Sequence, residues 1–151
     1  MNTSASPITG EETTDPGTPL GVLAEFYRAF NGRDLALMRQ NWQPDECVLD
    51  NPLGGIRRGW TEIEPLYAKL FTGRARVYVE FYDYSLHQGK DIFCAAGRER
   101  GCFEKDGEVI ELAIRTSRIY RFDGTRWRQI HHHGSIEDAG LLATYQAAVL
   151  R

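Results

Sequence analysis

The sequence predicts an α+β domain in which helices cover one face of a curved antiparallel sheet. Apolar residues recur at helical spacing through the first half of the chain and again at its end, whereas residues 75–134 alternate with a period of two. Short turns separate the alternating stretches, and such links favour antiparallel pairing of consecutive strands. Helices followed by a run of strands and a last helix are typical of this fold class.

Local signals place the helices. Thr18 followed by Pro19 is an N-cap with proline at the first helical position, and Asn31-Gly32 ends this helix. Asp34 caps a second, shorter helix, and Thr61 with Glu64 forms a capping box for a third, which Gly73 ends. A last helix begins at about Glu137. The expected apolar faces comprise Val22, Leu23, Phe26, Tyr27 and Phe30, then Leu35, Met38 and Trp42, then Ile63, Leu66, Tyr67, Leu70 and Phe71, and finally Leu141, Leu142, Tyr145 and Val149.

The strands follow from alternation and turn residues. A short strand at 47–50 is broken by the turn sequence Asn-Pro-Leu-Gly-Gly. Four longer strands are bounded by turns at Gln88-Gly89-Lys90, Lys105-Asp106-Gly107 and Asp123-Gly124. We expect these strands at residues 75–87, 91–104, 108–122 and 126–134.

The composition restricts the class of protein. A length of 151 residues suits one domain, which we place at residues 18–151 after a flexible, polar segment at 1–17. The net charge of −3, with acids interleaved among the arginines, argues against nucleic-acid partners. No apolar run is long enough to span a membrane, and no signal peptide is recognisable. Three cysteines without paired spacing favour reduced thiols and a cytoplasmic location.

Arg118 is the first candidate for a functional residue. Alternation within 109–122 gives one face Ile110, Leu112, Ile114, Thr116, Arg118, Tyr120 and Phe122, which is the expected core face. A guanidinium in an apolar row needs an anion, a wet cavity or a partner, because an unpaired buried charge is very unfavourable. The residues leave two interpretations open, a structural ion pair or an anchor for an acidic ligand.

The three histidines at 131–133 are the second candidate. Regular alternation would place His131 and His133 inward with Trp127, and His132 outward. Two such imidazoles could bind a metal, but no third ligand stands at suitable spacing, so we expect none. Core histidines that are simply hydrogen-bonded are common. Two of them near Arg118 favour a pocket with a polar floor.

The chain from about residue 18 resembles the superfamily of nuclear transport factor 2. This superfamily includes ketosteroid isomerase, the SnoaL-like cyclases and the association domain of calcium/calmodulin-dependent protein kinase II. The resemblance rests on element order and on FYRAFNGRDL (26–35), LDNPLGG (49–55), SRIYRFDG (117–124) and WRQIHHHGS (127–135). It implies a cone-like fold, in which helices and a curved sheet enclose a pocket and the outer sheet face often forms dimers.

The isomerase chemistry does not transfer along this resemblance. Where that enzyme has its carboxylate base, this chain has Asn51, preceded by Asp50. The first-helix tyrosine of the enzyme matches Phe26, with Tyr27 one position away, and its protonated aspartate matches Arg118. An amide is no carboxylate base, and a permanently charged arginine is no neutral acid.

The kinase association domain is more similar over residues 117–135. Its pocket arginine corresponds to Arg118, and its two alternate histidines correspond to His131 and His133. The resemblance implies that these three residues line a cavity.

Two functions from different classes remain. One is a cofactor-free acid–base enzyme, an isomerase, dehydratase or cyclase acting on a small, partly apolar molecule with or without a carboxylate. The other is a non-catalytic module that binds a ligand and forms oligomers. In both, the partners are a small molecule and a second copy of the chain, which would meet through outward residues such as Ile119, Ile130 and Val79. The candidate catalytic residues are His131, His133 and Asp50, and the candidate binding residues are Arg118, Asn51, Tyr27, Phe26, Trp42, Tyr120 and Arg98.

Overall fold

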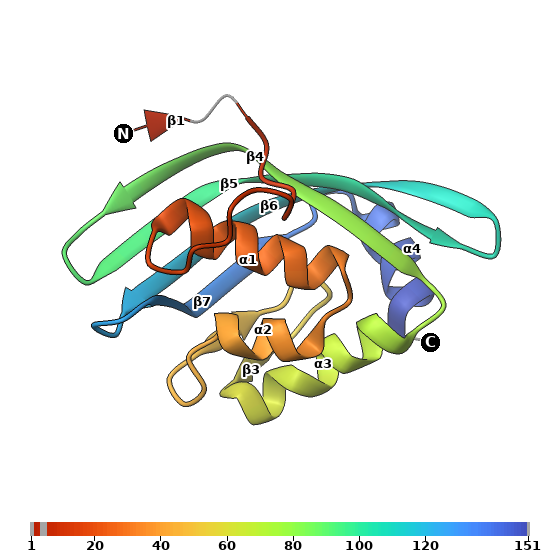
Figure 1. Ribbon diagram of the computed structural model, residues 1–151. Helices are drawn as coiled ribbons and strands as arrows, with labels where there is room; N and C mark the ends of the chain where they lie inside the picture. The colour runs from red at the N-terminus through yellow and green to blue at the C-terminus, as the bar shows by residue number, and fades with distance from the viewer. Residues whose placement is uncertain (1, 4–5, 151) are drawn as a thin grey trace.

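The computed structural model describes residues 2–3 and 6–150, which form four helices and seven strands (Figure 1). The helices are α1 (Pro19–Asn31), α2 (Leu35–Asn41), α3 (Trp60–Thr72) and α4 (Ala139–Leu150). The strands are β1 (Asn2–Thr3), β2 (Val48–Asp50), β3 (Ile56–Arg58), β4 (Arg76–Gln88), β5 (Ile92–Lys105), β6 (Glu108–Phe122) and β7 (Trp127–Ser135). The four long strands and all four helices therefore lie where the sequence predicts them, to within two residues.

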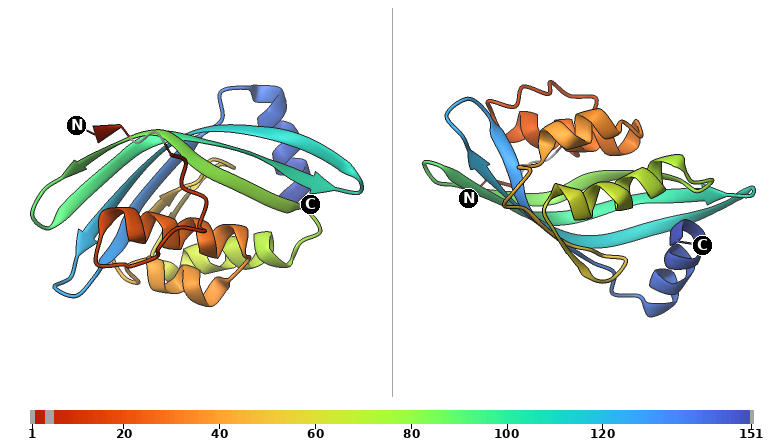
Figure 2. Two further views of the ribbon diagram at one scale, coloured as in Figure 1. Left: turned by 45° about the horizontal axis from the view of Figure 1, so that its top comes forward. Right: turned by 90° about the horizontal axis from the view of Figure 1, so that it is seen from below.

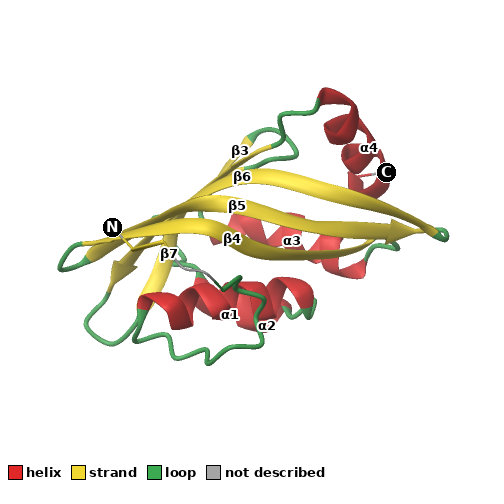
Figure 3. Ribbon diagram, turned by 90° about the horizontal axis from the view of Figure 1, so that it is seen from above, coloured by secondary structure: helices red, strands yellow, loops and turns green. Residues whose placement is uncertain are grey.

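The strands form one curved sheet in the order β1-β4-β5-β6-β7-β2-β3. All neighbours are antiparallel except β2 and β7, which run parallel. Helices α1, α2 and α3 lie against the concave face, and α4 lies at the end of the sheet where β5 and β6 are joined (Figures 2 and 3). The predicted α+β fold, with helices on one face of a curved sheet, is confirmed. The sequence did not predict the short strands β1 and β3.

The ends of the helices follow the sequence in two of three cases. The Thr18 hydroxyl accepts a hydrogen bond from the Gly21 amide, and the Asp34 carboxylate accepts one from Leu37, as expected for N-caps. The capping box predicted for α3 is wrong, because this helix begins after Gly59 without a side-chain cap. Glu64 instead accepts a hydrogen bond from the Trp60 indole and forms an ion pair with Arg39.

The interior face of β6 is the one that alternation predicts. Its even-numbered residues from Leu112 to Tyr120 are buried, while Glu111, Ala113 and Arg115 are exposed. Across the strand pair, β5 buries its odd-numbered residues up to Phe103 other than the two glycines, namely Phe93, Ala95, Glu99 and Phe103. The core therefore lies between this face and helices α1 to α3. Val79, which we had expected on the outer face, is buried on this inner side.

Strand β7 contains an irregularity that alternation could not reveal. Gln129 pairs with Tyr120 and His131 pairs with Ile119, so Ile130 has no partner residue in β6. One extra residue in a strand is a β-bulge, and it reverses the faces of all residues beyond it. The bulge decides which histidine faces inward.

The polar segment before α1 makes specific contacts. Ile8 is buried and pairs with Phe81 of β4 through two backbone hydrogen bonds. The Arg28 guanidinium of α1 donates to the carbonyl groups of Gly10 and Glu12, and the Trp127 amide donates to the carbonyl of Pro16. Residues 6–17 thus lie along α1 and β4, whereas residues 1 and 4–5 of the expected segment lie outside the described residues. The flexibility of residues 1–17 and the domain boundary at residue 18 stay predictions.

None of the helices among residues 2–3 and 6–150 combines the length and the apolar character needed to cross a membrane.

Candidate functional site

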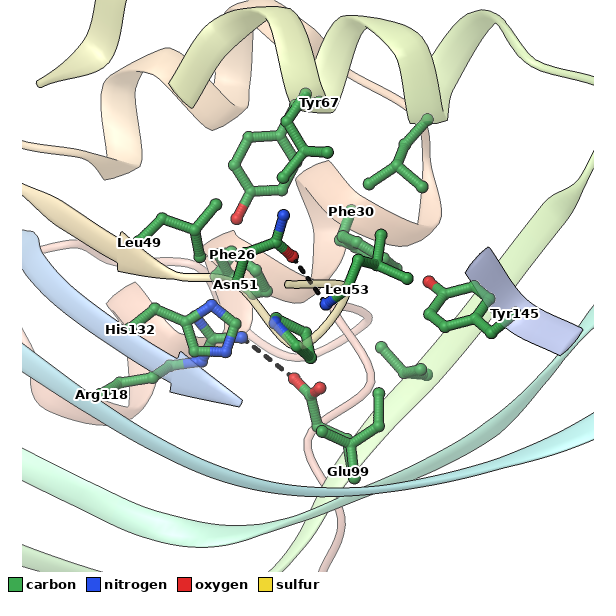
Figure 4. A pocket seen from close by; sticks show the side chains of 15 residues that line it. Phe26, Phe30, Leu49, Asn51, Leu53, Tyr67, Glu99, Arg118, His132 and Tyr145 are labelled. Atoms are coloured by element: carbon green, nitrogen blue, oxygen red, sulfur yellow. Dashed lines mark hydrogen bonds and ion pairs between the residues drawn. The ribbon is translucent and has the colours of Figure 1, made fainter. Parts of the chain in front are cut away.

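A small cavity lies between the concave face of the sheet, helices α1 and α3, and the loop that joins β2 to β3 (Figure 4). Its volume is about 40 Å³, which is room for roughly three water molecules. Its walls are mostly apolar, with a few polar groups that converge on one side, the usual composition of a ligand site. The lining residues are Phe26, Phe30, Leu49, Asn51, Pro52, Leu53, Leu66, Tyr67, Leu70, Val79, Glu99, Ile114, Arg118, His132 and Tyr145.

Arg118 lies at the floor of this cavity and is completely buried. Its Nη2 donates to Glu99 Oε2 at 3.0 Å, its Nη1 to Gln129 Oε1 at 2.6 Å, and its Nε to the Tyr27 hydroxyl at 3.4 Å. The guanidinium carbon also lies 3.6 Å from the centre of the Phe26 ring, a cation–π contact. The ion pair inside the domain, one of our two interpretations, is therefore present, and the same side chain lines the cavity.

Glu99 is a site residue that our sequence reasoning missed. Besides Arg118, the Tyr27 hydroxyl donates to Glu99 Oε2 at 2.5 Å. Burial raises the pKa of Tyr27 well above its ordinary value, so this hydroxyl keeps its proton. Alternation within β5 could have found Glu99, since it shares a face with Phe93, Ala95 and Phe103. A carboxylate on this otherwise apolar face of β5 indicates a buried polar site, just as the arginine does in β6.

His132, and neither of its neighbours, is the histidine of the cavity. The register places it directly opposite Arg118, and its ring lies next to that guanidinium (Figure 4). The side chain is buried, its ring meets Phe26 edge-on, and neither ring nitrogen has a hydrogen-bond partner among the described residues. Burial, reinforced by the positive charge of Arg118, holds the pKa of His132 well below its ordinary value. The imidazole is therefore neutral at pH 7.

The prediction that His131 and His133 face the interior is wrong. The bulge at Ile130 turns both to the outer face, where His133 is exposed and its Nδ1 lies 3.5 Å from Asp50 Oδ2. Asp50 reaches the same face because it pairs with His133 in the parallel register of β2 and β7. Partial burial lowers the pKa of His131. These three candidate catalytic residues therefore lie together, but on the opposite side of the sheet from the cavity.

The predicted binding residues separate into two groups. Phe26, Asn51 and Arg118 line the cavity, and Tyr27 lies directly behind Arg118. The Asn51 side chain accepts a hydrogen bond from the Leu53 amide, which fixes the turn at the cavity wall.

The remaining three predicted binding residues lie away from the cavity. Tyr120 is buried against Phe93, with ring centres 4.7 Å apart, and Trp42 is buried beside Tyr67. Arg98 is exposed on the outer face, because even-numbered residues of β5 point outward there, and it pairs with Asp83.

Two tyrosines complete the polar lining. Tyr67 of α3 and Tyr145 of α4 belong to the predicted apolar helix faces, and Figure 4 shows their hydroxyl groups directed toward the cavity. Burial raises the pKa of both hydroxyls, so they stay protonated and can donate hydrogen bonds. Sequence reasoning treated both residues as core, because amphipathic spacing does not distinguish a core tyrosine from one at a cavity.

The described residues contain no cluster of three or more histidine, cysteine or acidic side chains arranged to hold a metal ion. That the protein carries no metal or cofactor stays a prediction.

Comparisons with solved structures find the same fold. A Thiobacillus denitrificans protein named as a candidate calcium/calmodulin-dependent protein kinase type II association domain is 24% identical, with a TM-score of 0.66, covering 81% of this chain and 97% of its own. A candidate dehydratase of the nuclear transport factor 2-like family from Streptomyces avermitilis is 18% identical, with a TM-score of 0.68, covering 78% and 92%. A Xanthomonas campestris protein named like the first is 17% identical, with a TM-score of 0.66, covering 85% and 98%.

A search of curated proteins finds no match to this chain. The model of the SnoaL-like domain family, however, matches residues 20–139, which include helix α1 except its first residue, helices α2 and α3, strands β2 to β7 and most of the cavity lining. The fold, the element order and this match agree with the resemblance seen in the sequence. The chain belongs to the SnoaL-like domain family, and it has the fold of the nuclear transport factor 2-like structures.

Proposed function

We propose that this protein binds a small molecule in the cavity and transfers a proton on it, as an isomerase or dehydratase does. The observation that carries this proposal is His132. A buried, neutral imidazole with two unpartnered nitrogen atoms at a small, mostly apolar cavity is a proton acceptor available to a bound molecule. Buried polar groups generally have hydrogen-bond partners, so the two nitrogen atoms of His132, which have none among the described residues, favour a bound molecule as their partner.

The reaction step common to isomerisation and dehydration is removal of a proton from a carbon next to a carbonyl group. His132 would accept this proton, and the electron pair of the C–H bond would move into an enolate. The hydroxyl groups of Tyr67 and Tyr145 are the donors able to stabilise the negative oxygen. Return of the proton from His132 to another carbon completes an isomerisation. Transfer of the same proton to a hydroxyl group leaving from the neighbouring carbon releases water and completes a dehydration.

Two further observations support the proposal. The Streptomyces avermitilis protein of the same fold is named as a candidate dehydratase. Every base in the cavity other than His132 is already engaged, since Glu99 accepts hydrogen bonds from both Tyr27 and Arg118. The three free cysteines agree with a reducing compartment, and we propose the cytoplasm.

The test is hydrogen–deuterium exchange in small carbonyl compounds, followed by proton NMR in heavy water. The protein should accelerate exchange at the carbon next to the carbonyl in at least one of a panel of small ketones and β-hydroxy ketones. His132→Gln should lower this rate about 10²- to 10⁴-fold, the contribution of a positioned general base. His133→Gln is the matched control, because it removes an adjacent imidazole from the outer face and should leave the rate unchanged.

Equal loss in both variants, or exchange that survives in His132→Gln, would contradict the assignment of the base. Binding of panel members without any acceleration would favour the second candidate function, ligand binding without turnover in an oligomer. That function is supported by the apolar side chains exposed on the outer sheet face, among them Tyr78, Ile92 and Val109. Two solved structures of the same fold are also named as kinase association domains.

A further inference from the structure

We infer that the cavity selects an uncharged ligand with a carbonyl or hydroxyl group over a carboxylate, and that Glu99 is the residue that sets this selectivity. The inference rests on the proposed function in so far as both use the same cavity. It changes the substrate class, because the sequence alone had suggested an acidic ligand held by Arg118.

The argument begins with the charges that line the cavity. The ionic groups among its described lining residues are Glu99 and Arg118, which form an ion pair, since burial keeps His132 neutral. Their side chains are 6% and 0% exposed, and they are joined at 3.0 Å. The two charges cancel at this distance, so the cavity has no net charge to offer an anion.

An anionic ligand would therefore be buried without a free counter-charge. It could reach Arg118 only by approaching the Glu99 carboxylate, and like charges in an apolar surrounding repel strongly. The guanidinium also has few free donors, because three of its five N–H groups already donate to Tyr27, Gln129 and Glu99. A carboxylate would lose its hydration and gain one or two shared hydrogen bonds.

A neutral ligand meets the opposite situation. A neutral imidazole offers one donor and one acceptor, and both nitrogen atoms of His132 are free of partners in the described part of the chain. The hydroxyls of Tyr67 and Tyr145 add donors on the facing walls, as Figure 4 shows. A carbonyl or hydroxyl group can use these sites without bringing a charge into the apolar interior. The volume of about 40 Å³ restricts the buried part of such a ligand to a few non-hydrogen atoms.

The experiment compares neutral and anionic molecules of the same shape. Acetamide with acetate, and isobutyramide with isobutyrate, are titrated near neutral pH while the ring resonances of His132 are followed by NMR. The wild-type protein should bind each amide at least tenfold more tightly than its carboxylate. Glu99→Gln keeps the shape and the acceptor for Arg118 and Tyr27 but leaves the arginine charge uncompensated. It should raise carboxylate affinity at least tenfold and reverse the order.

Glu137→Gln is the matched control, because it removes the same charge from an exposed ion pair with Arg115. It should leave both affinities unchanged. The wild-type comparison needs no variant, so it decides the matter even if Glu99→Gln does not fold. Carboxylate binding equal to or tighter than amide binding, or no response of His132 to either molecule, would overturn the inference. Selectivity for amides without catalysed proton exchange would leave it standing and contradict only the proposed enzyme function.

Discussion

At the scale of single residues, His132 depends on its surroundings for its properties. An exposed histidine has an ordinary pKa near 6.5 and carries charge below that pH. Inside the cavity, burial and the guanidinium across the strand pair both oppose protonation. The same arrangement that makes the ring a proton acceptor therefore links folding to pH.

The stability of the protein should fall in mild acid because of this ring. The folded-state pKa of His132 lies well below the unfolded value of 6.5, so below pH 6.5 the unfolded chain binds one more proton than the folded chain. Stability is constant with respect to this group above pH 6.5 and declines as the pH falls toward the folded-state pKa. The expected slope is about 1.4 kcal/mol per pH unit for one proton.

Urea unfolding at a series of pH values measures this slope. His132→Gln should lower the slope of unfolding free energy against pH by about the contribution of one proton between pH 6.5 and 5. His133→Gln should leave this slope close to that of the wild-type protein. Parallel curves for wild type and His132→Gln would show that the ring titrates normally in the folded protein.

Sequence reasoning at this scale found part of the site. Arg118 was visible because strand β6 alternates without interruption, so its interior face could be read directly. Glu99 was equally visible in β5 but was treated as a surface acid among arginines. His132 could not be found, because a bulge leaves no residue signature in a strand of ordinary composition. The interior face of β7 reverses at Ile130, and only the pairing with β6 shows it.

At the scale of secondary-structure elements, helices and long strands follow from local signals. Caps, turns and periodicity depend on neighbouring residues, so the sequence predicts them closely. The contacts of residues 6–17 could not be predicted in this way, because the polar composition of the segment resembles that of a flexible tail. Its contacts depend on Arg28 and on the exposed edge of β4, and these partners are distant in the sequence.

Gly10 is the residue that lets this segment approach α1. Its φ is 99°, and a Cβ there would lie 2.4 Å from the Arg28 amide nitrogen. Gly124 has a similar φ of 97° with no atom within 4 Å of a Cβ, so it is a matched control for backbone strain alone. Gly124→Ala should lower the free energy of unfolding by about 1–3 kcal/mol, the usual effect of such strain.

Gly10→Ala should add a steric clash to the same strain. We expect a larger loss of unfolding free energy than in Gly124→Ala, together with faster proteolysis between residues 6 and 17. Equal losses, with the segment still protected, would mean that the close packing against α1 contributes nothing.

At the scale of the whole molecule, the sheet has one face covered by helices and one face open (Figure 2). The open face carries exposed apolar side chains among its arginines, including Tyr78 and Ile92. Surfaces of this composition commonly mark interfaces between subunits. A homodimer through this face therefore remains our proposal, with Val79 removed from the expected contact because it is buried inside.

Light scattering at micromolar concentration should give twice the 17.2 kDa of one chain. Ile119→Lys places a charge at the centre of the open face, between Cys94 and His131 of the neighbouring strands, and should yield monomers. Leu20→Lys, at an exposed apolar position on α1, should leave the dimer intact. A wild-type mass of 17.2 kDa would contradict the proposal, and ten or more subunits would favour the association-domain alternative.

The extra residue in β7, Ile130, also determines how this strand responds to insertions and deletions during evolution. In regular alternation from Trp127, loss of Ile130 would leave Gln129 inward, His131 outward and His132 inward, so the same imidazole would reach the cavity without a bulge. If the bulge instead relaxed with Ile130 retained, His131 and His133 would turn inward and His132 outward. A histidine faces the cavity in each case. Three histidines in succession therefore make the site tolerant of single-residue insertions and deletions. With a single histidine, one such change would turn the imidazole away from the cavity.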